Sequence, residues 1–234
     1  MAAMAAITTR DRNGPAAGVS TRGGRRLTAD ARRRQLFDVA LALFAEHGYA
    51  ATTMDDIAEA AGVTKPLVYQ HFDSKRALYL ELLDVFSREM IDRIVEATAA
   101  ADGPRQQVEL GFAAYFELMV NNERAFRLLY GRDAPDDPEL GAALHRVEEA
   151  IAVAIDPLID AGLDAAHRHL LARAVVGMAE GASRYWLDTR RDDPTVPDGL
   201  LPPVPEVDRI VESGRLGAQL ADFAWAGLRQ VHRI

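Results

Sequence analysis

Hydrophobic positions recur at intervals of three and four residues along most of the chain, which is the spacing of an amphipathic α-helix. The first such run begins after Thr28, whose hydroxyl can cap a helix, and ends at Gly48, where glycine permits a left-handed terminal residue. Its apolar positions are Leu36, Val39, Ala40, Leu43 and Phe44. We find no convincing run of alternating β-branched residues, so the sequence predicts an all-α fold.

Two short helices joined by a tight turn are predicted next. Thr53 can cap the first, which spans about 54–61 and stops at Gly62. Thr64 can cap the second, which spans about 65–72 and has a proline in its first turn, where a missing N–H costs nothing. Such a pair fits a helix-turn-helix, in which the second helix enters the major groove of DNA.

The remainder of the chain is also predicted to be helical. A long helix is expected to begin after Asp73 or Ser74 and to continue to about Thr98. Glycine and proline separate further periodic segments near 105–130, 138–160, 164–189 and 206–232. We therefore expect a disordered basic arm (1–27), a helix-turn-helix DNA-binding domain (28–74) and a larger C-terminal ligand-binding and dimerisation domain (75–234).

The charge of the chain is distributed unevenly. The net charge is −8, but residues 1–80 carry 11 basic and 8 acidic side chains, whereas residues 81–234 carry 16 basic and 27 acidic ones. A weakly basic N-terminal segment on an acidic body suits a DNA-binding module, although a chance distribution is the alternative. Residues 10–34 contain eight arginines. Part of the arm is expected to follow the DNA backbone or to enter the minor groove, and the alternative is a disordered tail with no energetic role.

Composition and missing motifs exclude several classes of function. The chain has no cysteine, which excludes disulfides and thiolate metal sites, and none of its six histidines stands in a metal-binding helical pair. Nucleophile-elbow, P-loop and dinucleotide-binding motifs are also missing, so neither an enzyme nor a cofactor is expected. With no signal peptide and no apolar run of about 20 residues, the sequence predicts a cytoplasmic protein that does not contact membranes.

The second short helix is expected to bury one side and expose the other. Val63, Val68 and Phe72 fit the buried stripe. The residues expected to face outward are Lys65, Leu67, Tyr69, Gln70 and His71. In the major groove, leucine can contact a thymine methyl group, glutamine can pair with adenine, and lysine, tyrosine and histidine can reach phosphates. The alternative is that Tyr69 and His71 only pack between helices.

Several short motifs follow one another between Phe44 and Leu78. They are Gly48-Tyr49, Thr52-Thr53, Ile57-Ala58, Ala61-Gly62-Val63, Tyr69-Gln70-His71-Phe72 and Ser74-Lys75. In this order and spacing they resemble the DNA-binding domain of TetR-family transcriptional regulators. The resemblance extends over about 32–83 and implies a homodimer on a palindromic DNA operator, usually a repressor that a small ligand releases.

The resemblance also assigns roles by position. It implies phosphate contacts at Thr53, Tyr69, His71 and Lys75, and base-edge positions at Thr64, Lys65, Pro66, Leu67 and Gln70. Many members of the family have glycine or alanine where this chain has Pro66, which leaves the base preference open. The bound ligand is expected to change the spacing of the two recognition helices through the long helix that starts at Lys75.

A dimer interface is required if two half-sites about 34 Å apart are to be read. Small residues allow helices to approach closely, and they accompany an apolar stripe on the last two long helices. The predicted interface residues are Gly177, Gly181, Leu220, Ala224, Gly227 and Val231. The alternative is that these positions pack within one subunit.

Aromatic and methionine residues are concentrated between about 112 and 130. Such residues line apolar ligand cavities, although they equally fill protein cores. The predicted ligand-binding residues are Phe112, Tyr115, Phe116, Met119, Arg127, Tyr130 and Met178. The hypothesis is an apolar small-molecule effector with Arg127 or His145 as its polar anchor. A helical adaptor or an enzyme that does not act on DNA is the other class of function.

Overall fold

The computed structural model describes residues 27–130, 137–159, 162–189 and 206–231, and within these ranges it contains helices and no strand. The all-α fold predicted from the sequence is therefore confirmed. The arginines of the arm up to Arg26 and the side chain of Val231 lie outside the described residues. In the described part of the chain, no helix combines the length and hydropathy that a bilayer crossing requires.

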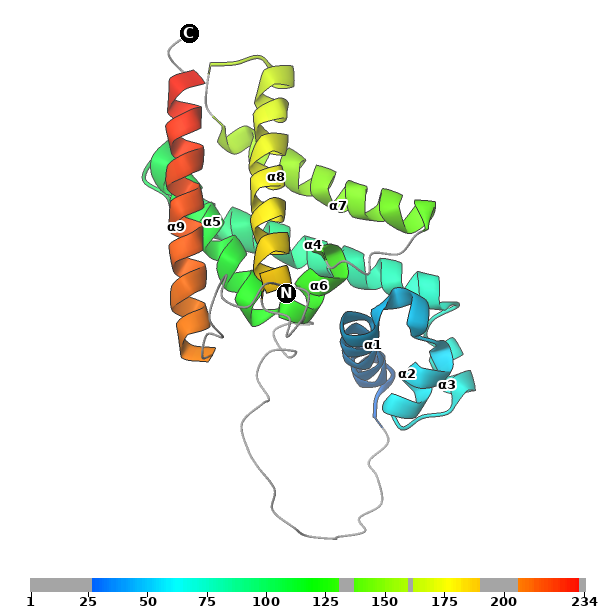
Figure 1. Cartoon of the computed structure of the whole chain (residues 1–234). Coiled ribbons are helices and arrows are strands. Elements are labelled where there is room, and N and C mark those ends of the chain that lie inside the picture. Colours follow the sequence, from blue (N-terminus) through cyan, green and yellow to red (C-terminus); the bar gives the residue numbers. More distant parts are fainter. Residues whose placement is uncertain (1–26, 131–136, 160–161, 190–205, 232–234) are drawn as a thin grey trace.

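The first three helices form a small unit at one end of the molecule (Figure 1). They are α1 (Ala29–Ala51), α2 (Met54–Ala60) and α3 (Lys65–Tyr69). Thr28 caps α1 as predicted, because its Oγ accepts a hydrogen bond from the backbone N–H of Ala31 at 3.2 Å. Gly48 has a φ of 81° and kinks α1, and helical structure resumes as far as Ala51, beyond the predicted end of the helix.

The helix α3 is shorter than the sequence predicts. It ends at Tyr69, and the following residues make a turn in which the N–H groups of His71 and Phe72 both donate to the carbonyl of Val68. This turn places the buried ring of Phe72 edge-on to Phe37, with 5.0 Å between ring centroids. Packing against α1 therefore decides where α3 ends, and the spacing of apolar residues in this segment does not reveal that end.

The long helix α4 (Lys75–Ala99) is capped by Ser74 and runs from the helix-turn-helix into the rest of the molecule (Figure 1). Its first turns pack on the small unit, where Tyr79 meets Phe44 and Tyr49. Its later turns bury Met90 and Ile94 in the C-terminal part. Because α4 contributes to both cores, any movement of its axis is transmitted to the helix-turn-helix.

Five further α-helices and one short 3-10 helix follow in the described residues. They are α5 (Pro104–Asn121), α6 (Glu123–Tyr130), α7 (Pro138–Ile155), η1 (Asp156–Leu158), α8 (Ala165–Thr189) and α9 (Glu206–Val231). The segment predicted as one helix near 105–130 is two helices, because Asn122 leaves the helical conformation and its side-chain amide donates to the carbonyl of Leu118.

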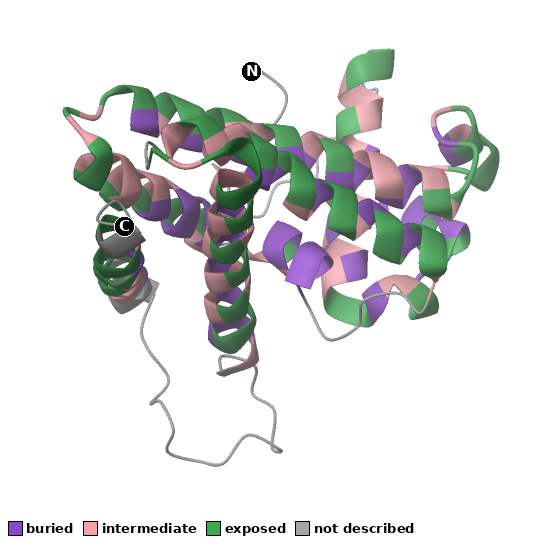
Figure 2. Cartoon of the chain, turned by 90° about the horizontal axis from the view of Figure 1, so that it is seen from above, coloured by how far each residue is buried: buried purple, intermediate pink, exposed green. Residues whose placement is uncertain are grey.

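The core of the C-terminal part lies where α4, α5, α6 and α7 meet. Phe86 and Phe126 pack edge to face there, and Phe116, Met119 and Leu140 are fully buried around them. Figure 2 shows that buried positions follow the sides of the helices turned toward one another and exposed positions follow the outer sides. The helices α8 and α9 stand side by side at the end of the molecule away from α2 and α3 (Figure 1).

Candidate DNA-binding site and ligand cavity

The N-terminus of α2 is closed by a reciprocal pair of hydrogen bonds. Thr53 Oγ accepts from the N–H of Asp56 at 3.2 Å, and the N–H of Thr53 donates to Asp56 Oδ2 at 2.8 Å. The Thr53 hydroxyl also donates to the same carboxylate oxygen at 2.7 Å, and these bonds lower the pKa of Asp56. The hydroxyl of Thr53, a predicted phosphate contact, is thus engaged within the protein.

The outer side of α3 has the exposure that a recognition helix requires. Val68 is fully buried, whereas Lys65, Pro66, Tyr69 and Gln70 are exposed. Leu67 and His71 are half-buried, and Thr64 is exposed at the N-cap, where its hydroxyl caps no backbone N–H. Gly62, with a φ of 65°, makes the turn before α3. The predicted base-edge residues therefore lie together at and around the outer side of one helix.

Lys75 has a position that the motif did not predict. Its ammonium group donates to the backbone carbonyls of Tyr49 at 2.7 Å and Thr52 at 2.8 Å. It also lies 4.2 Å from the centre of the Tyr49 ring, and partial burial lowers its pKa. Lys75 thus fixes the end of α1 against the start of α4. The phosphate contact expected of Lys75 stays a prediction that requires these bonds to rearrange or to be shared.

Arg33 on α1 joins the turn after α3 to α4, and the sequence analysis assigned it no role in the fold. Its guanidinium donates to the carbonyl of His71 at 2.7 Å and pairs with Glu81 on α4. It also lies 4.4 Å from the centre of the Phe72 ring. Because all three contacts come from distant segments, no local motif could identify this residue among the many arginines.

Two adjoining apolar cavities lie between α4, α5, α6, α7, α8 and α9, with volumes of about 80 and 60 Å³. Ile94, Phe112, Ile155 and Val175 line both of them. Two tyrosines, Tyr115 and Tyr130, line the smaller one, and Trp225 on α9 lines the larger one. The arrangement suits an elongated apolar molecule.

The predicted ligand-binding residues divide between cavity and core. Phe112, Tyr115 and Tyr130 line the cavities. Phe116 and Met119 are fully buried in the core and Met178 packs at its edge, so none of the three is among the lining residues. Most of the cavity residues that the sequence analysis missed are aliphatic ones on α4, α5, α7, α8 and α9, whose types and spacing do not differ from those of ordinary core residues.

The two predicted polar anchors lie elsewhere. Arg127 forms an ion pair with Glu123 on its own helix, at 2.6 Å, and His145 on α7 is exposed, 3.3 Å from Glu148. Neither residue is among those that line the cavities. The polar side chains among the lining residues include those of Thr98, Gln107 and the two tyrosines, and the hydroxyl of Tyr115 is 2.9 Å from Ser183 Oγ, which itself donates to the carbonyl of Ala179. Burial raises the pKa of both Tyr115 and Tyr130, so both are neutral.

The helices α8 and α9 present small and apolar residues to the outside. Gly177, Gly181 and Gly227 are exposed, and a β-carbon added to any of them would meet no atom within 4 Å. The large side chains of Leu170, Tyr185 and Phe223 are 63%, 51% and 68% exposed. We call these six residues the outer α8–α9 face.

Two of the predicted interface residues lie off this face. Ala224 is buried within the chain, because α9 packs closely on α5 along the line of Ala221 and Ala224. Leu220 is half-buried and packs at the edge of the same core. The apolar stripe of α9 thus serves two purposes, since one side fills the subunit core and the neighbouring side faces outward.

Comparison with known proteins decides the family. A family model described as "Bacterial regulatory proteins, tetR family" matches residues 36–82. The HTH-type transcriptional activator FasR of Mycolicibacterium smegmatis is 33% identical over 219 residues, which cover 93% of this chain and 91% of that protein. The chain belongs to the TetR family.

FasR is named an activator, but other relatives of this TetR-family protein are named repressors. The HTH-type transcriptional repressor KstR2 of Rhodococcus jostii is 41% identical over 78 residues, 33% of this chain and 38% of that one. A tetR-family regulator from Streptomyces coelicolor has a TM-score of 0.60 at 26% identity, covering 88% of this chain and 89% of the other. The transcriptional regulator FadR of Bacillus subtilis, solved in complex with stearoyl-CoA, has a TM-score of 0.63 at 17% identity, covering 80% of this chain and 96% of the other.

Membership establishes that this TetR-family chain is a DNA-binding transcription regulator, and it confirms the resemblance recognised in the sequence. The division into a helix-turn-helix domain and a larger helical domain agrees with the fold of these relatives. The individual DNA, ligand and dimer contacts stay predictions.

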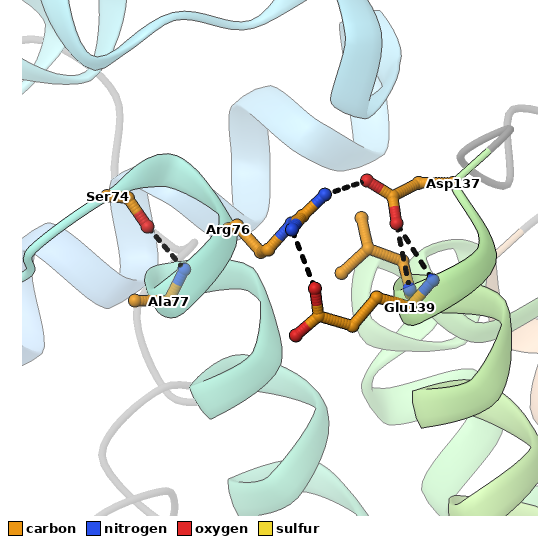
Figure 3. A network of polar contacts seen from close by, with 6 residues as sticks. Ser74, Arg76, Ala77, Asp137 and Glu139 are labelled. Atoms are coloured by element: carbon orange, nitrogen blue, oxygen red, sulfur yellow. Dashed lines mark hydrogen bonds and ion pairs between the residues drawn. The ribbon is translucent and has the colours of Figure 1, made fainter.

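One ion-pair network of this TetR-family chain connects α4 with α7 (Figure 3). Arg76, which follows Lys75, donates to Asp137 and to Glu139 Oε2, the latter at 2.6 Å. Asp137 also caps α7 by accepting from the N–H groups of Glu139 and Leu140. The first turn of α4 is thus tied to the start of a helix whose far end, at Ile151 and Ile155, lines the cavity.

Proposed function

We propose that this TetR-family protein binds a palindromic DNA operator as a homodimer in the cytoplasm and leaves the operator when an apolar ligand occupies the C-terminal cavity. The observation that carries the proposal is the path of α4. One helix begins at the DNA-binding unit with Lys75 and Arg76, and it lines the cavity with Ile94. A ligand that displaces α4 changes the spacing of the two recognition helices.

The size of the cavity supports a change of shape on binding. Its two parts hold about 80 and 60 Å³, whereas pockets for small molecules usually measure roughly 300–1,000 Å³. We therefore expect a ligand of ordinary size to push apart helices that line the cavity. The protein interior is densely packed, so such helices shift as units.

A direct route from the cavity to the DNA-binding unit supports the same proposal. Ile151 and Ile155 near the end of α7 line the cavity, and Asp137 at its start binds Arg76. When the ligand displaces α7, the ion pairs draw the first turn of α4 with it. A coupling free energy of about 1–3 kcal/mol would weaken DNA binding by roughly 5- to 150-fold.

The ligand is proposed to be an elongated apolar molecule with a group that can hydrogen-bond a tyrosine hydroxyl. The lining is aliphatic and aromatic apart from a few polar side chains, among them Tyr115 and Tyr130. Long acyl chains are the first probes to use, because the FadR structure of the same fold was solved with stearoyl-CoA.

Repression is proposed as the output, with activation as a second candidate. The relative similar over most of its length, FasR, is named an activator, whereas KstR2 is named a repressor. DNA affinity alone does not determine whether transcription is repressed or activated, since this depends on where the operator lies relative to the promoter. Transcription in vitro from the selected operator, with and without the protein, distinguishes the two.

Selection from a random duplex library tests the proposal. The full-length protein is expected to enrich a palindrome whose half-sites are about one DNA turn apart, and light scattering on the same sample is expected to give the mass of a dimer. Palmitoyl- and stearoyl-CoA are then titrated into the complex, with acetyl-CoA as the matched control for the headgroup. Selection of no sequence above background would contradict operator binding, and equal responses to all three thioesters would contradict an apolar site.

A further inference from the structure

The helix-turn-helix unit carries little positive charge of its own. Residues 27–80 include six basic and seven acidic residues. Arg33, Lys75 and Arg76 are held by hydrogen bonds within the protein. Sequence-independent DNA affinity comes from basic groups that neutralise phosphates and release counterions. An acidic residue beside the recognition helix therefore changes how strongly the unit attracts DNA of any sequence.

Asp55 is such a residue, and it contacts the first residue of the recognition helix. Lys65 Nζ on α3 donates to Asp55 Oδ2 on α2 at 2.7 Å. The side chains are 50% and 62% exposed, so the pair lies on the open surface. The hydrogen bond and the charge of Asp55 raise the pKa of Lys65, which stays protonated.

The geometry of this ion pair suits base recognition better than phosphate binding. A lysine ammonium has three N–H donors, and Asp55 occupies one of them. The two that remain match the two acceptors, O6 and N7, that guanine presents in the major groove. The N-terminal residues of the second helix in a helix-turn-helix contact base edges, and Lys65 is the first residue of α3. Because Asp55 already offsets the positive charge of Lys65, the electrostatic attraction between Lys65 and a DNA phosphate is weaker.

We propose that Asp55 determines sequence specificity through Lys65: it holds the ammonium so that one guanine in each half-site is recognised, and it reduces attraction to phosphates. Asp55 is a positioning residue, since the contact to the base belongs to Lys65. The inference rests on the proposed binding of a specific operator. Unlike the capping carboxylate of Asp56, which accepts hydrogen bonds from Thr53 beside its own helix, that of Asp55 accepts a hydrogen bond from another helix.

The experiment compares the full-length wild type with Asp55→Asn, Lys65→Met and the double variant. Each is selected against a random duplex library and then titrated against a fixed random duplex at several salt concentrations. Asp55→Asn is expected to lose the preference for guanine at one position in each half-site. Its salt slope is expected to steepen by about 0.9, which changes affinity roughly three- to four-fold for a fourfold change in salt.

Asp73→Asn is the matched control, because it removes one exposed negative charge from the same unit at a residue that follows α3. It is expected to keep the guanine preference. In the Lys65→Met background, Asp55→Asn is expected to leave the salt slope unchanged. Circular dichroism verifies that each variant is folded.

Two outcomes would overturn the inference. One is an unchanged base preference in Asp55→Asn, and the other is a steeper salt slope from Asp55→Asn even without Lys65, which would indicate simple repulsion of DNA. Failure of the wild type to select any sequence would instead contradict the proposed operator function. The two failures are therefore distinguishable in the same set of titrations.

Discussion

Individual residues of the DNA-binding unit make hydrogen bonds within the protein that compete with contacts to DNA. Thr53 and Lys75 occupy positions where the family resemblance implies phosphate contacts, yet the hydroxyl of one and the ammonium of the other are bonded inside the protein. Substituting either residue will alter stability as well as affinity. Their contributions to DNA binding have to be measured together with the free energy of unfolding.

Thr53→Ala is expected to destabilise the protein by about 1 kcal/mol at pH 7, because α2 loses its N-cap hydroxyl. Urea denaturation measures this, and Thr53→Ser, which keeps a hydroxyl, is the control. The difference between wild type and Thr53→Ala is expected to shrink with acidification. Hydrogen bonds to Thr53 lower the pKa of Asp56 in the folded protein. The stabilisation from the ionised carboxylate is therefore fully present above the unfolded pKa of Asp56, about 4, and is lost as the pH falls through the folded pKa. A difference that stays constant down to pH 3 would contradict the role of the ionised carboxylate.

At the scale of elements, α4 and α7 connect the two parts of the molecule. Arg76→Gln removes the ion pairs with Asp137 and Glu139 while it leaves the helix in place (Figure 3). The ligand-induced loss of operator affinity is expected to become several-fold smaller, because α7 can no longer pull the first turn of α4 with it through these ion pairs. Fluorescence anisotropy on the operator, with and without a ligand found by screening, measures the change.

Arg88→Gln is the control for this prediction. Arg88 is also an exposed arginine on α4, but its guanidinium pairs with Asp84 on the same helix. It is expected to leave the response to ligand unchanged. If both variants retain the full response, the Arg76 network does not carry the signal, and packing between α4 and α5 is the route to test next.

At the scale of the whole molecule, the outer α8–α9 face decides whether two recognition helices can act together. Phe223→Asp places a charge on a side chain that is 68% exposed. It is expected to shift the protein toward monomers in light scattering and to weaken operator binding at least tenfold, since one half-site alone then supplies the contacts. Val153→Asp, at an exposed apolar position on α7, is the control and should stay dimeric. A dimeric Phe223→Asp protein would place the interface elsewhere.

The sequence by itself determined the all-α class, the starts of several helices and the helix-turn-helix. Their signals are local: Thr28, Thr53 and Ser74 cap helices through bonds that span three residues, and Gly62 adopts a φ that favours glycine. The family motif lies in the same short segment, so residues 36–82 could be recognised without any knowledge of packing.

Only the tertiary structure decided which side chains line the cavity, where Lys75 and Arg76 bind and which side of α9 is free. Ile94 and Ile155 line one cavity although 60 residues separate them, and Arg76 meets Asp137 across a similar distance in sequence. Aliphatic residues at helical spacing look alike whether they border a cavity or fill a core. The difference arises from the segment that packs opposite, and local sequence does not encode it.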